Sequence, residues 1–206
     1  MAENHRRLCE AVGADPDSLV SPRQVHGARI VRVGGESRGR IIPDCDGLVT
    51  DEPGVALLLR FADCVPLIAY DPEHHAVGVA HAGWRGTIAG IARNLVEAMG
   101  VAFHSRPDKL IVGIGPSIGP CCYQVGADVL EAARRTWGEL DGLFQQREDD
   151  GLFFDLWAAN RRLLEDAGVR SIEVSGLCTA CHVDEFYSHR RERGMTGHHG
   201  ALAMLL

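Results

Sequence analysis

Apolar and polar residues alternate along the chain in blocks that predict strands and helices in turn. Short apolar runs are bounded by glycine, proline or charged residues, which is typical of strands. A turn is expected at Ser21-Pro22 and a surface loop over the glycine-rich residues 34–40. We expect strands at residues 28–33, in two pieces on either side of Pro53-Gly54, and at residues 65–70, 76–81, 110–115 and 171–176.

Helical periodicity marks several of the segments between these strands. Apolar residues recur near the helical period over residues 86–100 and predict a helix, with Thr87 capping its start and Gly100 ending it. Further helices are expected at residues 6–12, 126–138 and 155–168. Because strands and helices interleave, and no repeat or linker divides the chain, the pattern predicts one α/β domain with a mixed sheet.

The composition favours a single globular domain. The 206 residues are 46% apolar and 24% charged, which suffices for one hydrophobic core. No apolar run approaches the roughly 20 residues of a membrane-spanning helix, and the charged N-terminus lacks the apolar segment of an export signal. A formal charge of −7 argues against a nucleic-acid scaffold, which needs a basic face. We therefore expect a cytoplasmic protein that binds neither membranes nor nucleic acids.

Seven cysteines and ten histidines raise the question of metal or thiol chemistry. An odd number of cysteines, two of them adjacent, does not suit a secreted disulfide framework, so reduced thiols are expected. His26, Cys64 and His81 each lie at or beside an expected strand end. Two imidazoles and one thiolate suit Zn²⁺ and leave one tetrahedral position for water or substrate. The alternative is a buried cysteine with two histidines that bond to the backbone.

The segment HAGWRGT, residues 81–87, joins an expected strand to an expected helix. Its glycines permit close approach, and an arginine fork matches the geometry of a phosphate group. Arg85 and the helix N-terminus at Thr87 therefore form a candidate anion site. The alternative is a tight strand-to-helix turn whose glycines serve only the backbone geometry.

The glycine- and proline-rich segment GIGPSIGPCCYQV follows the strand at residues 110–115 and contains Cys121 and Cys122. Cys122 is a candidate nucleophile with His81 or His26 as its base. The alternative is that one cysteine of this pair packs in the core and the other has no role.

The segment CTACH, residues 178–182, matches the signature of covalent haem attachment. Attachment requires export, for which the chain shows no signal, so a redox dithiol, a second metal site and incidental cysteines are the open alternatives. Arg190 and Arg191 follow in SHRRERG and offer a second anion contact, unless they are simply solvated.

Taken in order, QVHG, DGLVTD, ADCVPL, HAGWRGT, IGPSIGPCCYQVG and CTAC…FYSHRRERGMTG resemble the multicopper polyphenol oxidase (laccase) family, also known as YfiH-like proteins. The match runs from about Pro22 to Gly197, and HAGWRG after an ADC strand is its most specific part. The resemblance implies a four-layer α/β/β/α fold with mixed sheets. It also implies that His26, Cys64 and His81 are the metal ligands.

The resemblance implies a function as well. Despite its name, the family is understood to contain zinc-dependent purine nucleoside phosphorylases that act on adenosine, inosine and methylthioadenosine and also deaminate adenosine. Phosphate held by Arg85 and the Thr87 helix start would attack C1′ of the ribose. In deamination a zinc-activated water would attack C6 of adenine, with Asp63 as a proton carrier. The expected partners are purine nucleosides and phosphate, and the expected state is a monomer or a weak homodimer.

The sequence departs from the family pattern at both ends. Family members commonly begin with a Thr-Arg and glycine-rich segment, and we expect residues 1–206 to lack it. His198 stands where the family usually has an arginine, which affects the expected phosphate or substrate contact there.

Three other functions stay open. The first is a copper-dependent phenol oxidase with Cu²⁺ in place of Zn²⁺, although the chain lacks the paired His-x-His segments that several copper ions need. The second is a cysteine hydrolase that uses Cys64 or Cys122 with His81. The third is a catalytically inactive nucleoside-binding module.

Overall fold

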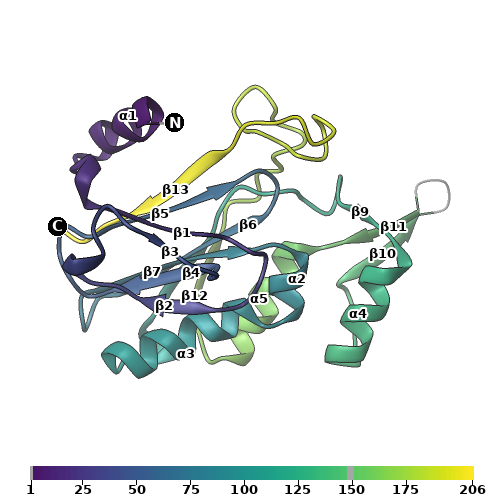
Figure 1. Cartoon of the computed structure of the whole chain (residues 1–206). Coiled ribbons are helices and arrows are strands. Elements are labelled where there is room, and N and C mark those ends of the chain that lie inside the picture. Colours follow the sequence, from purple (N-terminus) through teal and green to yellow (C-terminus); the bar gives the residue numbers. More distant parts are fainter. Residues whose placement is uncertain (1, 148–150) are drawn as a thin grey trace.

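The computed structural model describes residues 2–147 and 151–206. Strands β1 to β7 follow one another without an α-helix between them, and α-helices are interspersed with strands only after β7 (Figure 1). The helices are α1 (Ala2–Val12), α2 (Trp84–Ile88), α3 (Ile91–Phe103), α4 (Ala127–Trp137) and α5 (Leu156–Asp166). The strands are β1 (Leu19–Pro22), β2 (Ile30–Arg32), β3 (Ile41–Ile42), β4 (Gly47–Thr50), β5 (Ala56–Phe61), β6 (Val65–Asp71), β7 (Ala76–Ala82), β8 (Ile111–Ile114), β9 (Gln124–Val125), β10 (Phe144–Arg147), β11 (Gly151–Phe154), β12 (Ser171–Val174) and β13 (His199–Ala203). Short 3₁₀ helices lie at Pro16–Ser18, Gly35–Ser37 and Pro107–Lys109.

The largest sheet has six strands in the order β12-β8-β6-β7-β4-β2. It is mixed, because β12–β8 and β4–β2 are parallel pairs and the other neighbours are antiparallel. Every residue of β7 is buried. Side chains alternate between the two faces of a strand, so His81 shares a face with Val77 and Val79. Those two valines belong to the core between the sheets, and the end of β7 therefore presents His81 on that side.

A second sheet of four strands, β13-β5-β1-β3, packs on this face. Successive side chains of β5 point to opposite faces of the sheet, and both faces are covered. Leu57, Leu59 and Phe61 belong to the core between the two sheets, whereas Ala56 and Leu58 pack with α1 residues. Strand β5 is thus apolar on both faces, as expected for a strand in an inner layer.

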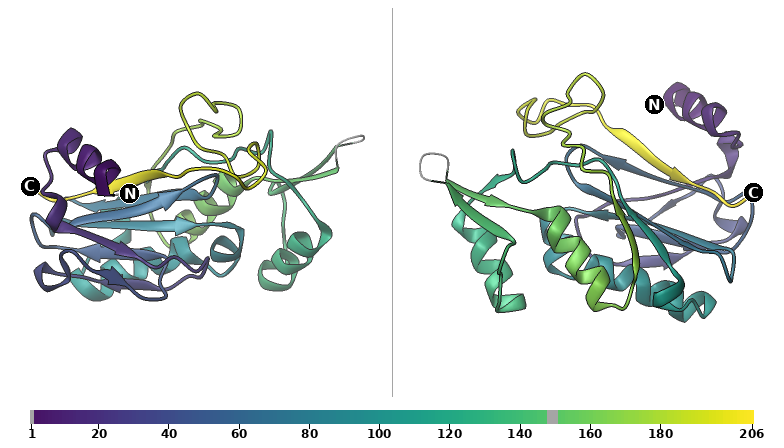
Figure 2. Two further views of the ribbon diagram at one scale, coloured as in Figure 1. Left: turned by 45° about the horizontal axis from the view of Figure 1, so that its top comes forward. Right: turned by 180° about the vertical axis from the view of Figure 1, so that it is seen from behind.

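Helices cover the outer faces of the two sheets (Figures 1 and 2). Helix α1 lies on the four-stranded sheet, and α2, α3 and α5 lie on the far face of the six-stranded sheet. Helix α3 contributes Ile91, Leu95 and Met99 to the core beneath that sheet. An antiparallel sheet, β10-β11-β9, lies beside α4. The predicted α/β/β/α layering with mixed sheets is confirmed.

The predicted helix over residues 86–100 was wrong in its boundaries. The segment forms two helices, because Gly90 adopts a left-handed φ of 84° between α2 and α3. Helix α2 begins after Gly83, so Thr87 lies inside it rather than at its cap. Gly100 does not end α3, since the left-handed terminal residue is His104, with a φ of 62°.

Other differences lie in short polar strands. The expected turn at Ser21-Pro22 belongs to β1, where Pro22 pairs only with β3 and its missing N–H is not needed by β5. Strands β9, β10, β11 and β13 were not predicted, because they are short and rich in glutamine, histidine or glycine. The remaining expected strands and helices are present with small shifts of their ends.

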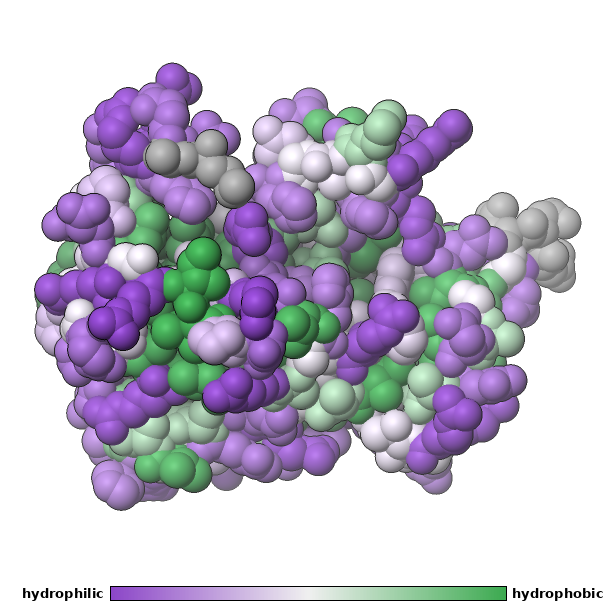
Figure 3. Space-filling view, in the orientation of Figure 1, coloured by the Kyte–Doolittle hydropathy of each residue, from purple (hydrophilic) through white to green (hydrophobic). Residues whose placement is uncertain are grey.

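Hydrophilic residues cover most of the face shown in Figure 3, and the apolar residues on it form separate patches. Among the described residues, no helix is both long and apolar enough to cross a membrane.

Candidate metal centre and active site

The structure brings His26, Cys64 and His81 together from three separate elements. His81 is the second-last residue of β7, Cys64 immediately precedes β6, and His26 lies in the loop before β2. Their candidate ligand atoms all lie within 4.8 Å of one another. The two imidazole rings meet edge to face with their centroids 4.9 Å apart. These distances would let the three side chains ligate a single ion after small adjustments.

Asp46, which precedes β4, holds His81 and the loop of His26 in place through hydrogen bonds. One of its oxygens, Oδ1, accepts hydrogen bonds from Nδ1 of His81 and the backbone N–H of His26, each over 2.9 Å. The other, Oδ2, accepts from the backbone N–H groups of Val25 and Gly27. Asp46 is fully buried, and these hydrogen bonds compensate for burying its charge. It therefore orients one imidazole ligand and holds the loop that carries the other.

Backbone geometry around the ligands is unusual for non-glycine residues. His26 has a φ of 59°, a left-handed conformation that costs free energy unless the surroundings enforce it. The hydrogen bonds that this loop donates to Asp46 hold His26 in that conformation. Gly83 provides the necessary space, because a Cβ there would lie 3.1 Å from Cys64 Sγ and 3.2 Å from His26 Cδ2. A Cβ at Gly86 would lie 2.6 Å from the carbonyl oxygen of Gly27.

The electrostatics of the group favour a thiolate. Burial alone would raise the pKa of Cys64, but hydrogen bonds with His26 and His81 outweigh it and lower the pKa to about 7. Burial alone would lower the pKa of His81, but Asp46 and Cys64 outweigh it and raise the pKa to about 9. The group thus holds opposite charges in close contact, and the thiolate form of Cys64 is the form that binds metals.

A cavity of about 490 Å³ opens onto these three residues. This volume is within the usual range of small-molecule sites. Arginine and histidine side chains give its wall a basic character. The lining residues are Gln24, His26, Arg60, Ala62, Asp63, Cys64, His81, Gly83, Trp84, Arg85, Ile118, Tyr123, Leu156, His189, Arg190 and His198.

Asp63, the residue before Cys64, lines this cavity but is heavily engaged. Its Oδ1 accepts from the Thr179 hydroxyl over 2.7 Å, and its Oδ2 accepts from the backbone N–H of Arg190 over 2.6 Å. Its φ of 81° is again left-handed. Asp63 therefore connects the loops containing Thr179 and Arg190 to the loop that carries Cys64. Its role as a proton carrier stays a prediction.

The two predicted anion-binding residues of HAGWRGT are placed differently. Arg85 lines the cavity, with its guanidinium stacked 4.3 Å from the ring centre of Trp84. Thr87 is fully buried and accepts a hydrogen bond from the Asn160 side chain over 3.0 Å. Its side chain packs α2 against α5 and does not line the cavity. The contact of Thr87 with phosphate stays a prediction, but the structure does not place this residue at the cavity, because the cap of α2 lies four residues earlier, at Gly83.

Arg190 and Arg191 also lie in different places. Arg190 lines the cavity, and its Nη1 donates to the carbonyl oxygens of Gln124 over 2.8 Å and Cys122 over 3.4 Å. Its guanidinium lies over the Tyr123 ring. Arg191 lines a neighbouring hollow instead and does not border the cavity.

Cys122, the candidate nucleophile, does not line the main cavity. Burial and the neighbouring Cys181 thiol raise its pKa far above the usual range, so the thiolate is disfavoured at neutral pH. Its sulfur lies 3.4 Å from Cys181 Sγ, and neither His81 nor His26 is its partner. Among the described residues, neither predicted base therefore contacts the Cys122 sulfur.

Sequence reasoning missed Asp46 and Tyr123. Asp46 opens the segment DGLVTD and looks like a turn residue, because its partners lie about 20 and 35 positions away. Tyr123 follows the cysteine pair and lines the cavity, where burial and the nearby Cys64 raise its pKa. An aromatic residue next to a conspicuous motif was the available signal.

The fold and the site define a layered α/β protein with a His-Cys-His group that could hold a metal ion, beside a basic cavity. Comparison with known families identifies the class more closely, since a family model described as multi-copper polyphenol oxidoreductase laccase matches residues 1–206. The chain belongs to this family, as its resemblance predicted.

Individual relatives agree with this placement. "Purine nucleoside phosphorylase YlmD" of Geobacillus stearothermophilus is 43% identical over 207 residues, which cover 96% of this chain and 76% of that protein. "Adenosine deaminase RL5", from an unknown prokaryotic organism, is 35% identical and covers 89% of this chain and 74% of its own length. The crystal structure of YlmD from G. stearothermophilus superimposes with a TM-score of 0.93 at 41% identity, covering 99% of this chain and 79% of that chain.

Proposed function

We propose that this protein is a metal-dependent purine nucleoside phosphorylase that cleaves adenosine, inosine and methylthioadenosine and also deaminates adenosine. The observation that carries the proposal is the placement of the His26, Cys64 and His81 group in the wall of the same cavity as Arg85 and Arg190. The names of relatives that share the family and the fold support both activities.

The ligand set fits zinc. Two imidazoles and a thiolate with a depressed pKa provide three ligands of the borderline-soft kind that Zn²⁺ prefers. The buried Asp46 behind His81 is the supporting carboxylate that zinc-bound histidines usually have. A bound zinc ion would polarise a substrate oxygen or lower the pKa of a water molecule in the fourth position.

Phosphorolysis needs a site for a dianion next to the ribose. In the reaction a phosphate oxygen bonds to C1′, the C1′–N9 bond breaks, and the purine keeps the electron pair and takes up a proton. The products are the free base and ribose 1-phosphate. Arg85, stacked on Trp84, presents a planar guanidinium to the cavity and is the proposed phosphate ligand. Arg190 supplies a second positive charge on the opposite loop.

The purine requires an apolar surface and proton exchange. The Tyr123 ring and Ile118 line the cavity and offer that surface. Asp63 and His198 are the proposed proton-exchanging groups. Burial, reinforced by Arg60, lowers the pKa of His198, so its neutral form predominates at neutral pH and can accept a proton.

The direct test is product analysis with zinc-loaded protein. Adenosine and phosphate should yield adenine and ribose 1-phosphate, together with inosine and hypoxanthine if deamination also occurs. The variant Arg135→Ala changes an exposed arginine on α4 and is the matched control for Arg85→Ala. Binding of adenosine in calorimetry without any product would contradict the enzyme proposal and favour an inactive binding module.

A copper-dependent phenol oxidase is the second candidate, because the family description itself names copper. Phenol oxidation that rises with copper content, in protein that does not cleave adenosine, would replace our proposal. The seven free cysteines favour a reducing compartment, which supports the cytoplasm as the site of action. A monomer or weak homodimer stays a prediction for sedimentation analysis.

A further inference from the structure

Four cysteines from two distant motifs meet beside the active-site cavity. Cys121 and Cys122 lie in the segment before β9, and Cys178 and Cys181 lie in the segment after β12. Their sulfur atoms all lie within 4.8 Å of one another. Cys181 Sγ is 3.4 Å from Cys122 Sγ and 3.7 Å from Cys121 Sγ. We call these four residues the cysteine cluster.

We propose that the cysteine cluster is a second metal site, a tetrathiolate centre for Zn²⁺ that is separate from the His26, Cys64 and His81 group. Zinc–sulfur bonds of about 2.3 Å in a tetrahedron place the sulfur atoms roughly 3.8 Å apart. The two separations of 3.4 and 3.7 Å are both slightly shorter than this spacing, so only small side-chain rotations are needed. Four thiolates with no open position form a structural rather than a catalytic zinc site.

The backbone prepares this geometry. Cys181 donates its backbone N–H to the carbonyl oxygen of Cys178 over 3.0 Å, which folds the C-x-x-C segment into a turn. Cys122 makes the same kind of turn with Gly119. The Gly119 N–H also donates to Cys178 Sγ over 3.2 Å, an interaction that stabilises a thiolate. A bridge between Ser117 and Cys178 aligns the two segments side by side.

The position of the cysteine cluster indicates what a second metal would do. The segment with Cys122 continues into Tyr123, and Thr179, which stands between Cys178 and Cys181, donates to Asp63 in the cavity. Arg190 crosses from its own loop to the carbonyl oxygen of Cys122. A metal in the cysteine cluster would therefore fasten together loops that form one wall of the cavity.

A redox disulfide is the rival chemistry for the same residues. All seven cysteines are free, and the separation of 3.4 Å between Cys122 and Cys181 exceeds the S–S bond length of about 2.05 Å. The convergence of four sulfurs rather than two favours metal binding, since a disulfide needs only one pair.

Metal analysis of three purified proteins tests the proposal. Cys64→Ala should lose zinc from the first site and keep one equivalent, whereas Cys178→Ser/Cys181→Ser should lose the equivalent that Cys64→Ala keeps. Cys9→Ala changes a buried cysteine far from both sites in the sequence and should keep the wild-type content. A double variant with wild-type zinc content, or a Cys64→Ala protein with none, would overturn the proposal. The result does not depend on whether the protein cleaves nucleosides.

Cobalt spectroscopy covers the case in which the double variant does not fold. Cys64→Ala loaded with Co²⁺ should show strong sulfur-to-cobalt absorption and tetrahedral d–d bands, because four thiolates bind one ion. Thiol titration of the same protein in denaturant, without reductant, should find every remaining cysteine reactive. Absence of the cobalt bands would overturn the proposal. A pair of thiols that is unreactive until reduced would show that the cysteine cluster is a disulfide site instead.

Discussion

Asp46 Oδ1 lies 2.9 Å from Nδ1 of His81, and both residues are buried. A carboxylate can only accept in this pair, so Nδ1 carries a proton. In the neutral ring, the form that binds a metal, the lone pair therefore lies on Nε2. The contact therefore fixes the tautomer of His81 in which Nε2 can bind a metal. The same carboxylate holds the His26 loop, so one buried charge supports two of the three ligands.

We expect Asp46→Asn to weaken metal binding about 10- to 100-fold, the range seen when a supporting carboxylate is lost. The amide keeps the size of the side chain but cannot hold the His81 tautomer with its charge. Competition with a fluorescent zinc chelator measures the change. Asp44→Asn is the matched control, because Asp44 is exposed and pairs with Arg23 on the surface. Equal zinc affinities for the two variants would remove Asp46 from the metal centre.

We expect Gly83→Ala to lower zinc affinity and activity while the protein stays folded. A Cβ at this position would lie 3.1 Å from Cys64 Sγ, so the thiolate must move away from its place between the two imidazoles. Gly113→Ala in β8 is the control, since a Cβ there would meet only the Ile68 carbonyl oxygen at 4.0 Å. Chelator competition and circular dichroism separate the two effects. Unchanged zinc binding in Gly83→Ala would show that the ligands are not packed as described.

The three candidate metal ligands could be picked out from the sequence because each lies beside a strand end within a recognisable motif. Their supporting residue could not, since Asp46 acts on residues 19 to 35 positions away and only the packing of β4 beside β7 unites them. The cysteine motifs show the same limit. Each was visible in the sequence, but a separation of about 60 residues hid the fact that they form one cluster.

The fold was predictable where burial dominates. Strands β6 and β7 are nearly continuous apolar runs, and runs of this length are typical of buried strands. Thr87 shows where local rules failed, because it has the chemistry of a cap but is used inside α2 to bond Asn160. Tertiary packing decided its role, and a local signal cannot contain that information.

We expect Arg85→Ala to reduce phosphorolysis of adenosine by about 10- to 150-fold in kcat/KM, the equivalent of losing roughly 1.5–3 kcal/mol of charge-assisted hydrogen bonding to phosphate. Most of the change should appear in the KM for phosphate. Deamination of adenosine in phosphate-free buffer should change much less, because it uses water. Initial rates of both reactions for Arg85→Ala and the Arg135→Ala control measure this. Equal losses in the two reactions would assign Arg85 to nucleoside binding instead.

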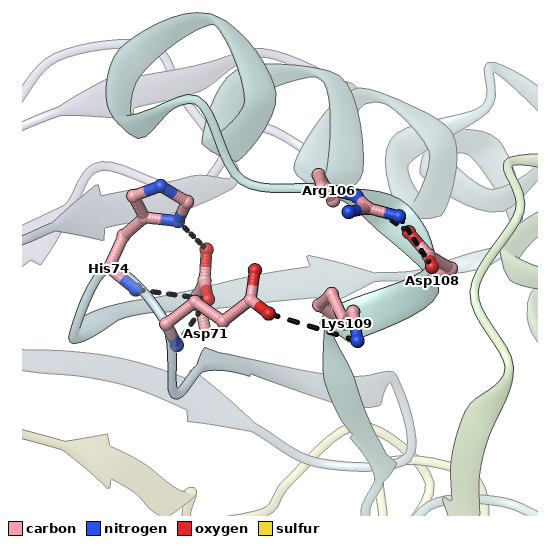
Figure 4. Close-up of polar contacts among 6 residues, drawn as sticks. Asp71, His74, Arg106, Asp108 and Lys109 are labelled. Carbon is pink, nitrogen blue, oxygen red and sulfur yellow. Dashed lines mark hydrogen bonds and ion pairs between the residues drawn. The ribbon is translucent and has the colours of Figure 1, made fainter.

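The turn between β6 and β7 rests on Asp71, which is fully buried (Figure 4). Its Oδ1 accepts from the backbone N–H groups of Glu73 and His74, and its Oδ2 bonds Nδ1 of His74 over 2.9 Å. We expect Asp71→Ala to lower the free energy of unfolding by about 1–3 kcal/mol, because the turn amides lose their acceptor. Denaturant unfolding at pH 7 measures the change.

The pH dependence gives this last prediction its sign. Burial raises the pKa of Asp71, but the nearby Ser105 hydroxyl and the hydrogen bonds from His74 outweigh it and leave the pKa below its ordinary value. The stabilisation is therefore complete above the unfolded pKa of about 3.9 and is lost as the pH falls through the folded value. The difference in unfolding free energy between wild type and Asp71→Ala should stay constant from about pH 7 to pH 5 and shrink at lower pH. Asp108→Ala, which removes the exposed pair with Arg106 in the same view, should cost less than about 1 kcal/mol. A difference that widens on acidification would show that Asp71 is protonated in the folded protein.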